Sequence, residues 1–295
     1  MQIIDGKKLS EEILDKVKRE VSLLPFTPVF CDVLVGEDPA SLQYVKMKGR
    51  MAVMMGIAFH KANFPSSVTT LELIKEIKAL NKIENMCGII VQLPLPPHLD
   101  RALVLNAIDS GLDVDCLGAV ASDNFYSHYN SETDLCFPTA LSCMALLDSL
   151  HLDLKTKNIA VLGQGILVGK PVSALLRYRG LSSITIDINT EHKEELIKNA
   201  DVIISGIGKS RHIKGDMIKK GVVLIDAGTS ESLERSSMGE PNAKIVGDVD
   251  LESVKDVASY VSPVPGGVGP VTIAMLLNNV LKVAQRRASM DDCAT

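Results

Sequence analysis

The chain has 295 residues, of which 46% are hydrophobic and 23% are charged, and its net charge is -5. Such a composition is typical of a packed globular protein, and the length suits two domains. Because the balance is mildly acidic and the Lys and Arg residues are scattered, nucleic acid and anionic membranes are excluded as expected partners. The six cysteines lack CxxC spacing, so we expect reduced core residues and no metal site. The N-terminus lacks the pattern of a targeting signal, and we expect a cytoplasmic protein.

Apolar runs of strand length alternate with helical periodicity along the chain, which predicts an α/β fold with parallel sheets. In the first half, the expected strands are 28–36, 58–64 and 87–93, and the expected helices are 11–22, 38–55, 69–81 and 98–109. In the second half, the expected strands are 158–163, 183–188, 201–208, 222–228, 244–247 and 260–264, followed by a helix at 270–287. The polar stretch 121–134 is the best candidate for a boundary between two lobes.

A glycine-rich turn follows the apolar strand at 158–163. Gly163, Gly165 and Gly169 have the spacing GxGxxxG, one residue longer than the usual dinucleotide-binding fingerprint, and Pro171 is expected to open the next helix. Glycines let the backbone approach a pyrophosphate, whose charge is favoured by the free amides of a helix N-terminus. A tight strand-to-helix turn without any ligand accounts for the same spacing about equally well.

Asp187 stands near the end of the following strand. An acidic residue at this place can hydrogen-bond the two hydroxyls of an adenosine ribose and repel a 2′-phosphate, which favours NAD over NADP. The alternative interpretation is an aspartate that only forms the turn at the strand end.

The segment "EDPASLQYVKMKGRMAVMMG" predicts one helix, with Asp38 as its N-cap. Ser41, Tyr44 and Lys48 then fall on one face. A phenol and an ammonium four residues apart could bind and polarise a flat aromatic substrate. The alternative is an ordinary pair of solvated side chains on a helix surface.

The run "CGIIVQLPLPPHLD" predicts a buried central strand that ends at the polar Gln92. Ligands of open α/β sheets bind at the carboxyl ends of the strands, so Gln92 is a candidate site residue. The two Leu-Pro units that follow stiffen the rim. The alternative is a glutamine that satisfies loop carbonyl groups.

Five segments together resemble the bifunctional methylenetetrahydrofolate dehydrogenase/methenyltetrahydrofolate cyclohydrolases, in order and over residues 1–285: "ASLQYVKMKGRMA", "GIIVQLPLPPHLD", "DVDCLG", "GDVDLESV" and "SPVPGGVGPVTIAMLLNN". The resemblance implies an N-terminal α/β catalytic lobe (1–136, with 268–295 packing back onto it) and a Rossmann-type dinucleotide-binding lobe (137–267). It also implies a C-terminal helix that returns to the first lobe, a folate cleft between the lobes, and a homodimer. The implied reactions are oxidation of 5,10-methylenetetrahydrofolate with NAD or NADP and hydrolysis of the product to 10-formyltetrahydrofolate.

The same resemblance assigns roles to particular residues. Lys48 matches the catalytic lysine, Tyr44 the aromatic platform, Gln92 the polar partner of the lysine, and Asp115 the carboxylate that holds the pterin. The other implied substrate contacts are Ser41, Val91, Leu93, Pro265, Gly266 and Gly267, where Pro265 to Gly267 form the crossover between lobes and the next helix begins near Thr272. The implied cofactor contacts are Gly163, Gln164, Gly165, Gly169, Asp187, Gly206, Gly208, Thr229 and Thr272.

Some positions depart from the family pattern. Gln164 and Gly165 stand where the family usually has Arg and Ser, and glutamine cannot supply the charged fork that binds a 2′-phosphate. With Asp187, this favours NAD, although NADP is the family default. Three further departures, which bear on how the pterin is placed, are Leu112, Cys116 and Phe137.

The chemistry separates the two steps. Removing a hydride needs alignment but no general base, whereas hydrolysis needs proton transfers, so we expect Lys48 to matter more for the second step. Three alternatives stay open: a monofunctional NAD-dependent methylenetetrahydrofolate dehydrogenase, a different two-lobe dehydrogenase acting on an amino or hydroxy acid, and a binding protein without turnover.

Overall fold

The computed structural model describes residues 1–235 and 241–292, and the chain divides into two compact units. The first, which we call the six-stranded unit, comprises Met1–Ser10 and Thr139–Thr272. The second, the three-stranded unit, comprises Glu11–Pro138 and the chain from Ile273 onward. No helix within the described residues has both the length and the apolar character that crossing a membrane would require.

The three-stranded unit is built on a parallel sheet with the strand order β3-β2-β4. Its strands are β2 (Val29–Val35), β3 (Ala58–Phe64) and β4 (Met86–Val91), which confirms the three strands expected in the first half of the chain. Its helices are most of α1 (Gly6–Val21), α2 (Pro39–Met54), α3 (Thr70–Leu80), α4 (Arg101–Leu105), α5 (Ala119–Ser127) and most of α10 (Val268–Asp292).

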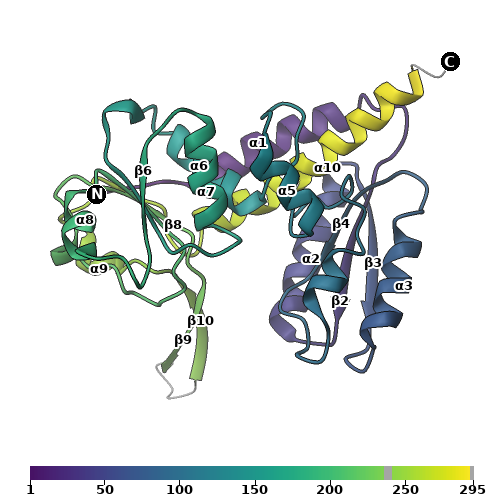
Figure 1. The fold of residues 1–295 in the computed structure, drawn as a ribbon, viewed down its shortest axis with the longest axis horizontal. Helices are drawn as coiled ribbons and strands as arrows, with labels where there is room; N and C mark the ends of the chain where they lie inside the picture. The colour runs from purple at the N-terminus through teal and green to yellow at the C-terminus, as the bar shows by residue number, and fades with distance from the viewer. Residues whose placement is uncertain (236–240, 293–295) are drawn as a thin grey trace. The chain divides into compact units, whose positions relative to one another are not determined.

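Helices cover both faces of this sheet, and the two faces have separate apolar cores. Strand residues alternate between the faces, so Phe30 packs with α1, α2 and α10, while Cys31 and Val33 pack with α3 and α4. Figure 1 shows α2 and α3 beside β2 and β3, and α1 running alongside α10. The C-terminal helix therefore belongs to this layered unit, as predicted: Asn279 Nδ2 donates to the carbonyl oxygens of Val114 at 2.8 Å and Cys136 at 2.6 Å.

The six-stranded unit contains a parallel sheet with the order β1-β11-β8-β7-β5-β6. The strands are β1 (Gln2–Ile3), β5 (Ile159–Leu162), β6 (Ser183–Ile186), β7 (Val202–Ser205), β8 (Val223–Asp226) and β11 (Tyr260–Val261). The helices are α6 (Pro138–Asp148), α7 (Gly169–Tyr178), α8 (Lys193–Asn199) and α9 (Leu251–Val254), with 3-10 turns η1 (Leu154–Thr156) and η2 (Gly215–Met217). The chain runs from β5 outward in both directions, and that reversal of strand order is where Rossmann-type sheets bind their ligands.

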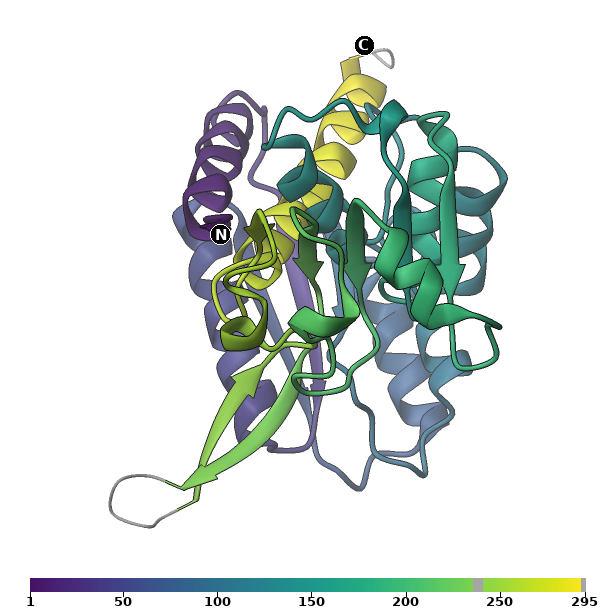
Figure 2. The same ribbon diagram turned by 90° about the vertical axis from the view of Figure 1, so that its left-hand side faces the viewer.

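Two strands lie outside this sheet. The strand expected at 244–247 overlaps the end of β10 (Pro241–Val246), which pairs antiparallel with β9 (Ser230–Arg235) and not with the parallel strands. Figures 1 and 2 both show this hairpin extending away from the body of its unit.

The helix expected at 98–109 is wrong in extent, because α4 covers only Arg101–Leu105. The stretch 121–134, the expected candidate for the boundary between two lobes, lies inside the three-stranded unit and starts with most of α5. Its polar composition conceals Phe125, which is 1% exposed and packs against the rings of Tyr126, Tyr129 and Phe137 at centroid distances of 5.0 to 5.3 Å. That aromatic cluster gives the helix a buried anchor, which single-residue polarity does not reveal.

Candidate functional site

Helix α2 places the first candidate residues. Asp38 is its N-cap, as predicted: the carboxylate Oδ2 accepts the Ser41 N–H at 2.8 Å, and a proline occupies the first turn. The buried face of the helix includes Ser41 and Lys48, whereas Tyr44, one turn before Lys48, is 37% exposed. Tyr44 therefore lies at the margin of the buried face, with much of its ring open to a partner.

The Lys48 ammonium lies among oxygen atoms contributed by two neighbouring strands. Its Nζ donates to Gln92 Oε1 at 2.8 Å and lies 2.7 Å from Asp32 Oδ2. Gln92 directly follows β4, and its Nε2 donates to the Leu93 carbonyl at 2.9 Å, which fixes the amide so that its oxygen faces the lysine. The structure thus brings Lys48 and Gln92 together. Neither isolated alternative, a solvated lysine or a glutamine serving only loop carbonyls, describes this contact.

Asp32 is a site residue that the sequence analysis missed. It lies in the middle of β2, and its side chain is fully buried against Lys48. Burial raises the pKa of the Asp32 carboxyl, and the charge and hydrogen bond of Lys48 oppose that rise. A signal was present in the sequence: an ionisable residue in the apolar run "VFCDVLV" must have a partner if the run is a buried strand.

Asp115 completes the charge cluster. Burial raises its pKa to about 7, the nearby Lys48 opposes the rise, and the charges of Asp113 and Asp32 add to it. Asp113 has a different environment, because its Oδ2 accepts the Gly118 N–H at 2.7 Å and so fixes the loop that carries Asp115. At neutral pH, Asp115 therefore changes protonation readily, and a ligand that donates hydrogen bonds to it will favour its ionised form.

The remaining predicted residues of this unit surround the same strand end. Val91 is the last residue of β4 and is 3% exposed, and Leu93 precedes a cis proline. The departures from the family pattern are accommodated as packed residues: Cys116 and Phe137 are buried, and Leu112 packs partly against the apolar cores on both faces of the sheet.

The glycine loop lies after β5, at the reversal of strand order. Gly163 has a φ of +84°, and a side chain on Gly169 would collide with the Gly163 carbonyl oxygen. A side chain on Gly165, in contrast, would meet nothing within 4 Å. Packing therefore does not require glycine here, and the missing side chain leaves the backbone accessible. Helix α7 begins at Gly169, two residues before the expected Pro171. Open backbone before a helix N-terminus fits a dinucleotide pyrophosphate.

Two buried carboxylates hold the other glycine loops of this unit, and the sequence analysis missed both. Asp248 accepts hydrogen bonds from Ser205 Oγ, Ile207 N and Lys209 N at 2.7 to 2.9 Å, which fixes the segment containing Gly206 and Gly208. Asp226 accepts from the Gly228, Asp248 and Val249 amides at 2.9 to 3.0 Å and so fixes the turn before Thr229. Asp248 belongs to the quoted motif "GDVDLESV", and Asp226 ends a buried strand, so both had a sequence signal.

Asp187 and Gln164 are the residues on which the expected cofactor preference depends. Asp187 is exposed, and its Oδ1 accepts the Asn189 N–H at 2.8 Å and the Thr190 hydroxyl at 3.1 Å. This is the turn geometry of the alternative interpretation. Gln164 Nε2 donates to the Gly163 carbonyl at 2.9 Å, so its amide helps to shape the glycine loop.

The proline- and glycine-rich crossover lies in the six-stranded unit. Gly267 N donates to the Pro263 carbonyl at 2.7 Å, Gly266 has a φ of +106°, and a side chain on Gly6 would collide with Gly267. Helix α10 begins at Val268, earlier than expected, so Thr272 lies in its second turn and its hydroxyl donates to the Val268 carbonyl at 3.1 Å. A cleft shared by this crossover and the Lys48 cluster stays a prediction.

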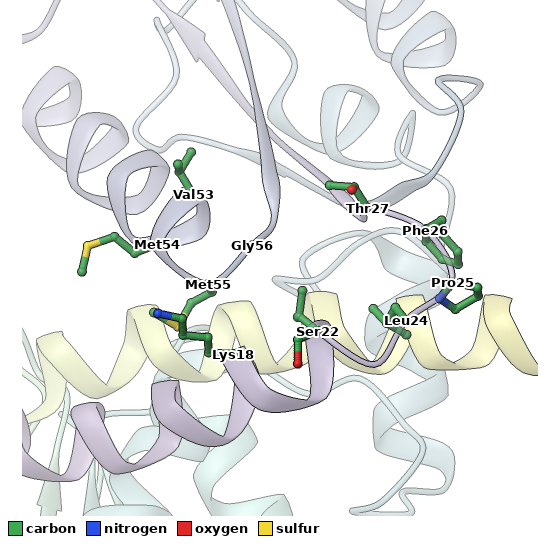
Figure 3. A pocket seen from close by; sticks show the side chains of 11 residues that line it. Lys18, Ser22, Leu24, Pro25, Phe26, Thr27, Val53, Met54, Met55 and Gly56 are labelled. Carbon is green, nitrogen blue, oxygen red and sulfur yellow. The ribbon is translucent and has the colours of Figure 1, made fainter.

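A separate cavity of about 490 Å³ lies in the three-stranded unit, and Figure 3 shows its lining. Lys18 and Ser22 line it from the end of α1, and Val53, Met54 and Met55 line it from the end of α2. None of the predicted site residues lines this cavity.

Comparisons with known proteins cover nearly the whole chain. Residues 4–115 match the family model for the tetrahydrofolate dehydrogenase/cyclohydrolase catalytic domain, and residues 137–288 match the NAD(P)-binding domain of the same family. The bifunctional protein FolD of Nautilia profundicola is 41% identical, over 98% of this chain and 99% of the relative.

Solved structures agree with these matches. The bifunctional enzyme FolD of Campylobacter jejuni is 36% identical with a TM-score of 0.88, over 97% of this chain and 99% of that one. The Trypanosoma brucei enzyme, solved with NADP and an inhibitor, is 31% identical with a TM-score of 0.89, over 97% of both chains. The chain therefore belongs to the tetrahydrofolate dehydrogenase/cyclohydrolase family.

Proposed function

We propose that this protein oxidises 5,10-methylenetetrahydrofolate to the 5,10-methenyl form with NAD or NADP and hydrolyses that product to 10-formyltetrahydrofolate. The observation that carries the proposal is the contact of Lys48 with Gln92, beside Asp115, in a chain that matches the family over both of its domains. Its relatives are named as bifunctional enzymes. The functional domains are 1–136 with 268–295 for folate, and 137–267 for the dinucleotide.

The oxidation step demands orientation more than proton transfer. Loss of a hydride leaves a positive charge that the two nitrogens flanking the one-carbon unit share, so no base needs to act. Tyr44 supplies an open aromatic face on which the folate ring system can stack. Asp115 accepts hydrogen bonds from the N–H groups of the pterin. A nicotinamide dinucleotide held at the glycine loop, at Gly163, Gly165 and Gly169, supplies the hydride acceptor.

The hydrolysis step assigns the proton work to Lys48. Water must attack an amidinium carbon, and protons must then move between oxygen and nitrogen. The Lys48 ammonium has three N–H donors, and Asp32 and Gln92 occupy two of them, so the third can face water or the substrate. Gln92 fixes the direction of the amine and Lys48 relays the proton. The lysine is therefore more important for hydrolysis than for oxidation.

The proposed cofactor preference is NAD. Gln164 has no charge to pair with a 2′-phosphate, and the exposed Asp187 carboxylate at the end of β6 would repel one. Both hydrogen bonds that the Asp187 carboxylate accepts within its own turn go to Oδ1, which leaves Oδ2 for a ribose hydroxyl. Parallel titrations of the dehydrogenase rate with NAD and NADP test this. A higher kcat/KM for NADP would refute it.

A Lys48→Met variant tests the assignment of the lysine. Formation of the methenyl product is followed by absorbance with NAD or NADP, and its hydrolysis is followed separately by the decay of added methenyltetrahydrofolate. We expect the variant to retain measurable oxidation and to lose hydrolysis. Equal loss of both rates in the variant would reject the division of roles. If the wild-type protein itself oxidises the substrate but does not hydrolyse the methenyl product, the monofunctional alternative is indicated.

The biological setting follows from the proposed reactions. The product, a formyl donor, belongs to one-carbon metabolism and suits purine biosynthesis. We propose a homodimer in the cytoplasm, and sedimentation analysis of the purified protein measures its oligomeric state.

A further inference from the structure

Asp32 occupies a position where a charge is costly. In the β2 register it lies opposite Lys61 of β3 and Ile90 of β4, and its side chain has 0% exposure. It shares a sheet face with Phe30 and Leu34, which are also buried. An apolar side chain would fit this position without any desolvation cost.

The contacts of Asp32 do not offset the desolvation free energy of its buried carboxylate. Its Oδ2 is met by Lys48 Nζ at 2.7 Å, and its Oδ1 has no hydrogen-bond donor among the residues that the structure describes. A buried ion pair whose remaining oxygen is unsatisfied adds little or nothing compared with apolar residues of similar size. A contribution to folding stability therefore does not explain why a carboxylate occupies this buried position. An effect on Lys48 does explain it.

The other charged groups nearby cannot take the place of Asp32. Asp113 accepts backbone N–H groups of its own loop, Gly118 among them, and Asp115 is close to half protonated at neutral pH because burial raises its pKa to about 7. Lys61 is exposed, although it lies opposite Asp32 in the sheet register. The neighbouring Cys31 thiol stays neutral, because burial raises its pKa to about 12. Asp32 is distinguished by its position, because its Oδ2 lies in direct contact with Lys48 Nζ at 2.7 Å.

We propose that Asp32 is a positioning residue for the cyclohydrolase step: its carboxylate holds Lys48 Nζ against Gln92 and keeps a negative charge in contact with the amine that relays the proton. The inference rests on the proposed function, because it assigns Asp32 an effect only through Lys48. Rigidity supports it, since the anion comes from the middle of a central strand and the cation from the buried face of a helix.

An Asp32→Asn variant tests the charge while nearly preserving the shape. Removing an anion in contact with an ammonium disfavours the protonated amine, so the limb of the hydrolysis pH profile that depends on Lys48 should move to lower pH. The direction is the same whether catalysis uses the charged or the neutral amine. An Asp32→Glu variant keeps the charge but lengthens the side chain, so it should lower the hydrolysis rate with a smaller displacement of the limb.

The matched control is Asp201→Asn. Asp201 also pairs with a lysine, Lys219, with 2.6 Å between Oδ1 and Nζ, but it lies in the six-stranded unit outside both candidate sites. This variant should leave the profile in place. An unchanged profile in Asp32→Asn would overturn the inference, and so would equal displacements in Asp32→Asn and Asp201→Asn.

A second measurement covers the case in which the Asp32 variants do not fold. In Lys48→Met, Asp32 loses the cation that opposes the burial-driven rise of its pKa. A carboxyl whose folded-state pKa is raised loses stability as pH rises, so the melting temperature of Lys48→Met should fall further below wild type between pH 5 and pH 8. The same pH-dependent difference in melting temperature must appear between the double variant Lys48→Met/Asp115→Asn and the single variant Asp115→Asn, because Asp115 is removed from both. A pH-independent difference would refute the charge pairing.

The two proposals fail differently. Retention of full hydrolysis by Lys48→Met would reject the catalytic assignment of the lysine. Loss of hydrolysis in Lys48→Met together with an unmoved profile in Asp32→Asn would reject only the positioning role of Asp32.

Discussion

Folate binding should become stronger as pH rises, because the proposed role of Asp115 is to accept hydrogen bonds from the pterin as an ionised carboxylate. Burial raises the pKa of this carboxyl to about 7, whereas its ordinary value is 3.8. With a pKa of 7, about 9% of the carboxyl is ionised at pH 6 and about 91% at pH 8. The dissociation constant should therefore fall about tenfold over this range, a change of about 1.4 kcal/mol.

The assay is a calorimetric titration with a folate analogue that does not itself titrate between pH 6 and pH 8. Repeating it in buffers with different ionisation enthalpies counts the protons exchanged, and binding at pH 6 should release close to one proton per site. An Asp115→Asn variant should bind more weakly at pH 8 and show no pH dependence. A flat dissociation constant in the wild type, or the same slope in the variant, would refute the assignment.

Three further changes test the supports of the two sites. Gly169→Ala places a methyl group against the Gly163 carbonyl oxygen, so dinucleotide affinity should fall at least tenfold while folate binding is retained, as titration of each ligand would show. Asp248→Ala leaves three donors without their acceptor and should lower the free energy of unfolding by about 2–5 kcal/mol, measured by urea denaturation. Asn279→Leu removes the hydrogen bonds to the Val114 and Cys136 carbonyl oxygens and should cost about 2–4 kcal/mol in the same assay, and an unchanged free energy of unfolding would contradict this.

The periodicity of apolar residues was sufficient to predict the central strands of each parallel sheet. The strands β2 and β5 are short, mainly apolar runs bounded by Gly, Pro or polar residues, and such runs give clear limits. Helix α2 was equally clear, since Asp38 and a following proline define its first turn. Local chemistry determines these elements, so a single sequence is enough to predict them.

Pairings over long sequence distance were not predictable in the same way. β1 has two residues and is a strand only because Tyr260 and Val261 lie beside it. Helix α5 depends on Phe137, which lies outside it in sequence, to complete the ring cluster around Phe125. In each case the stabilising contact lies beyond the window that periodicity examines.

The candidate site shows the same contrast between residues that local segments predict and contacts that depend on strand pairing. Lys48 and Gln92 were predicted because each lies in a recognisable segment. Their contact depends on the parallel pairing of β2 with β4. In that pairing the Gln92 N–H donates to the Val33 carbonyl oxygen at 2.9 Å, which places Gln92 beside β2. The same pairing places Asp32 on the sheet face that α2 covers. A buried aspartate within an apolar strand therefore carries information that motif matching omits. A carboxylate buried there needs a specific cation as its partner, and in this chain that cation is the lysine to which the proposed function assigns the proton transfer.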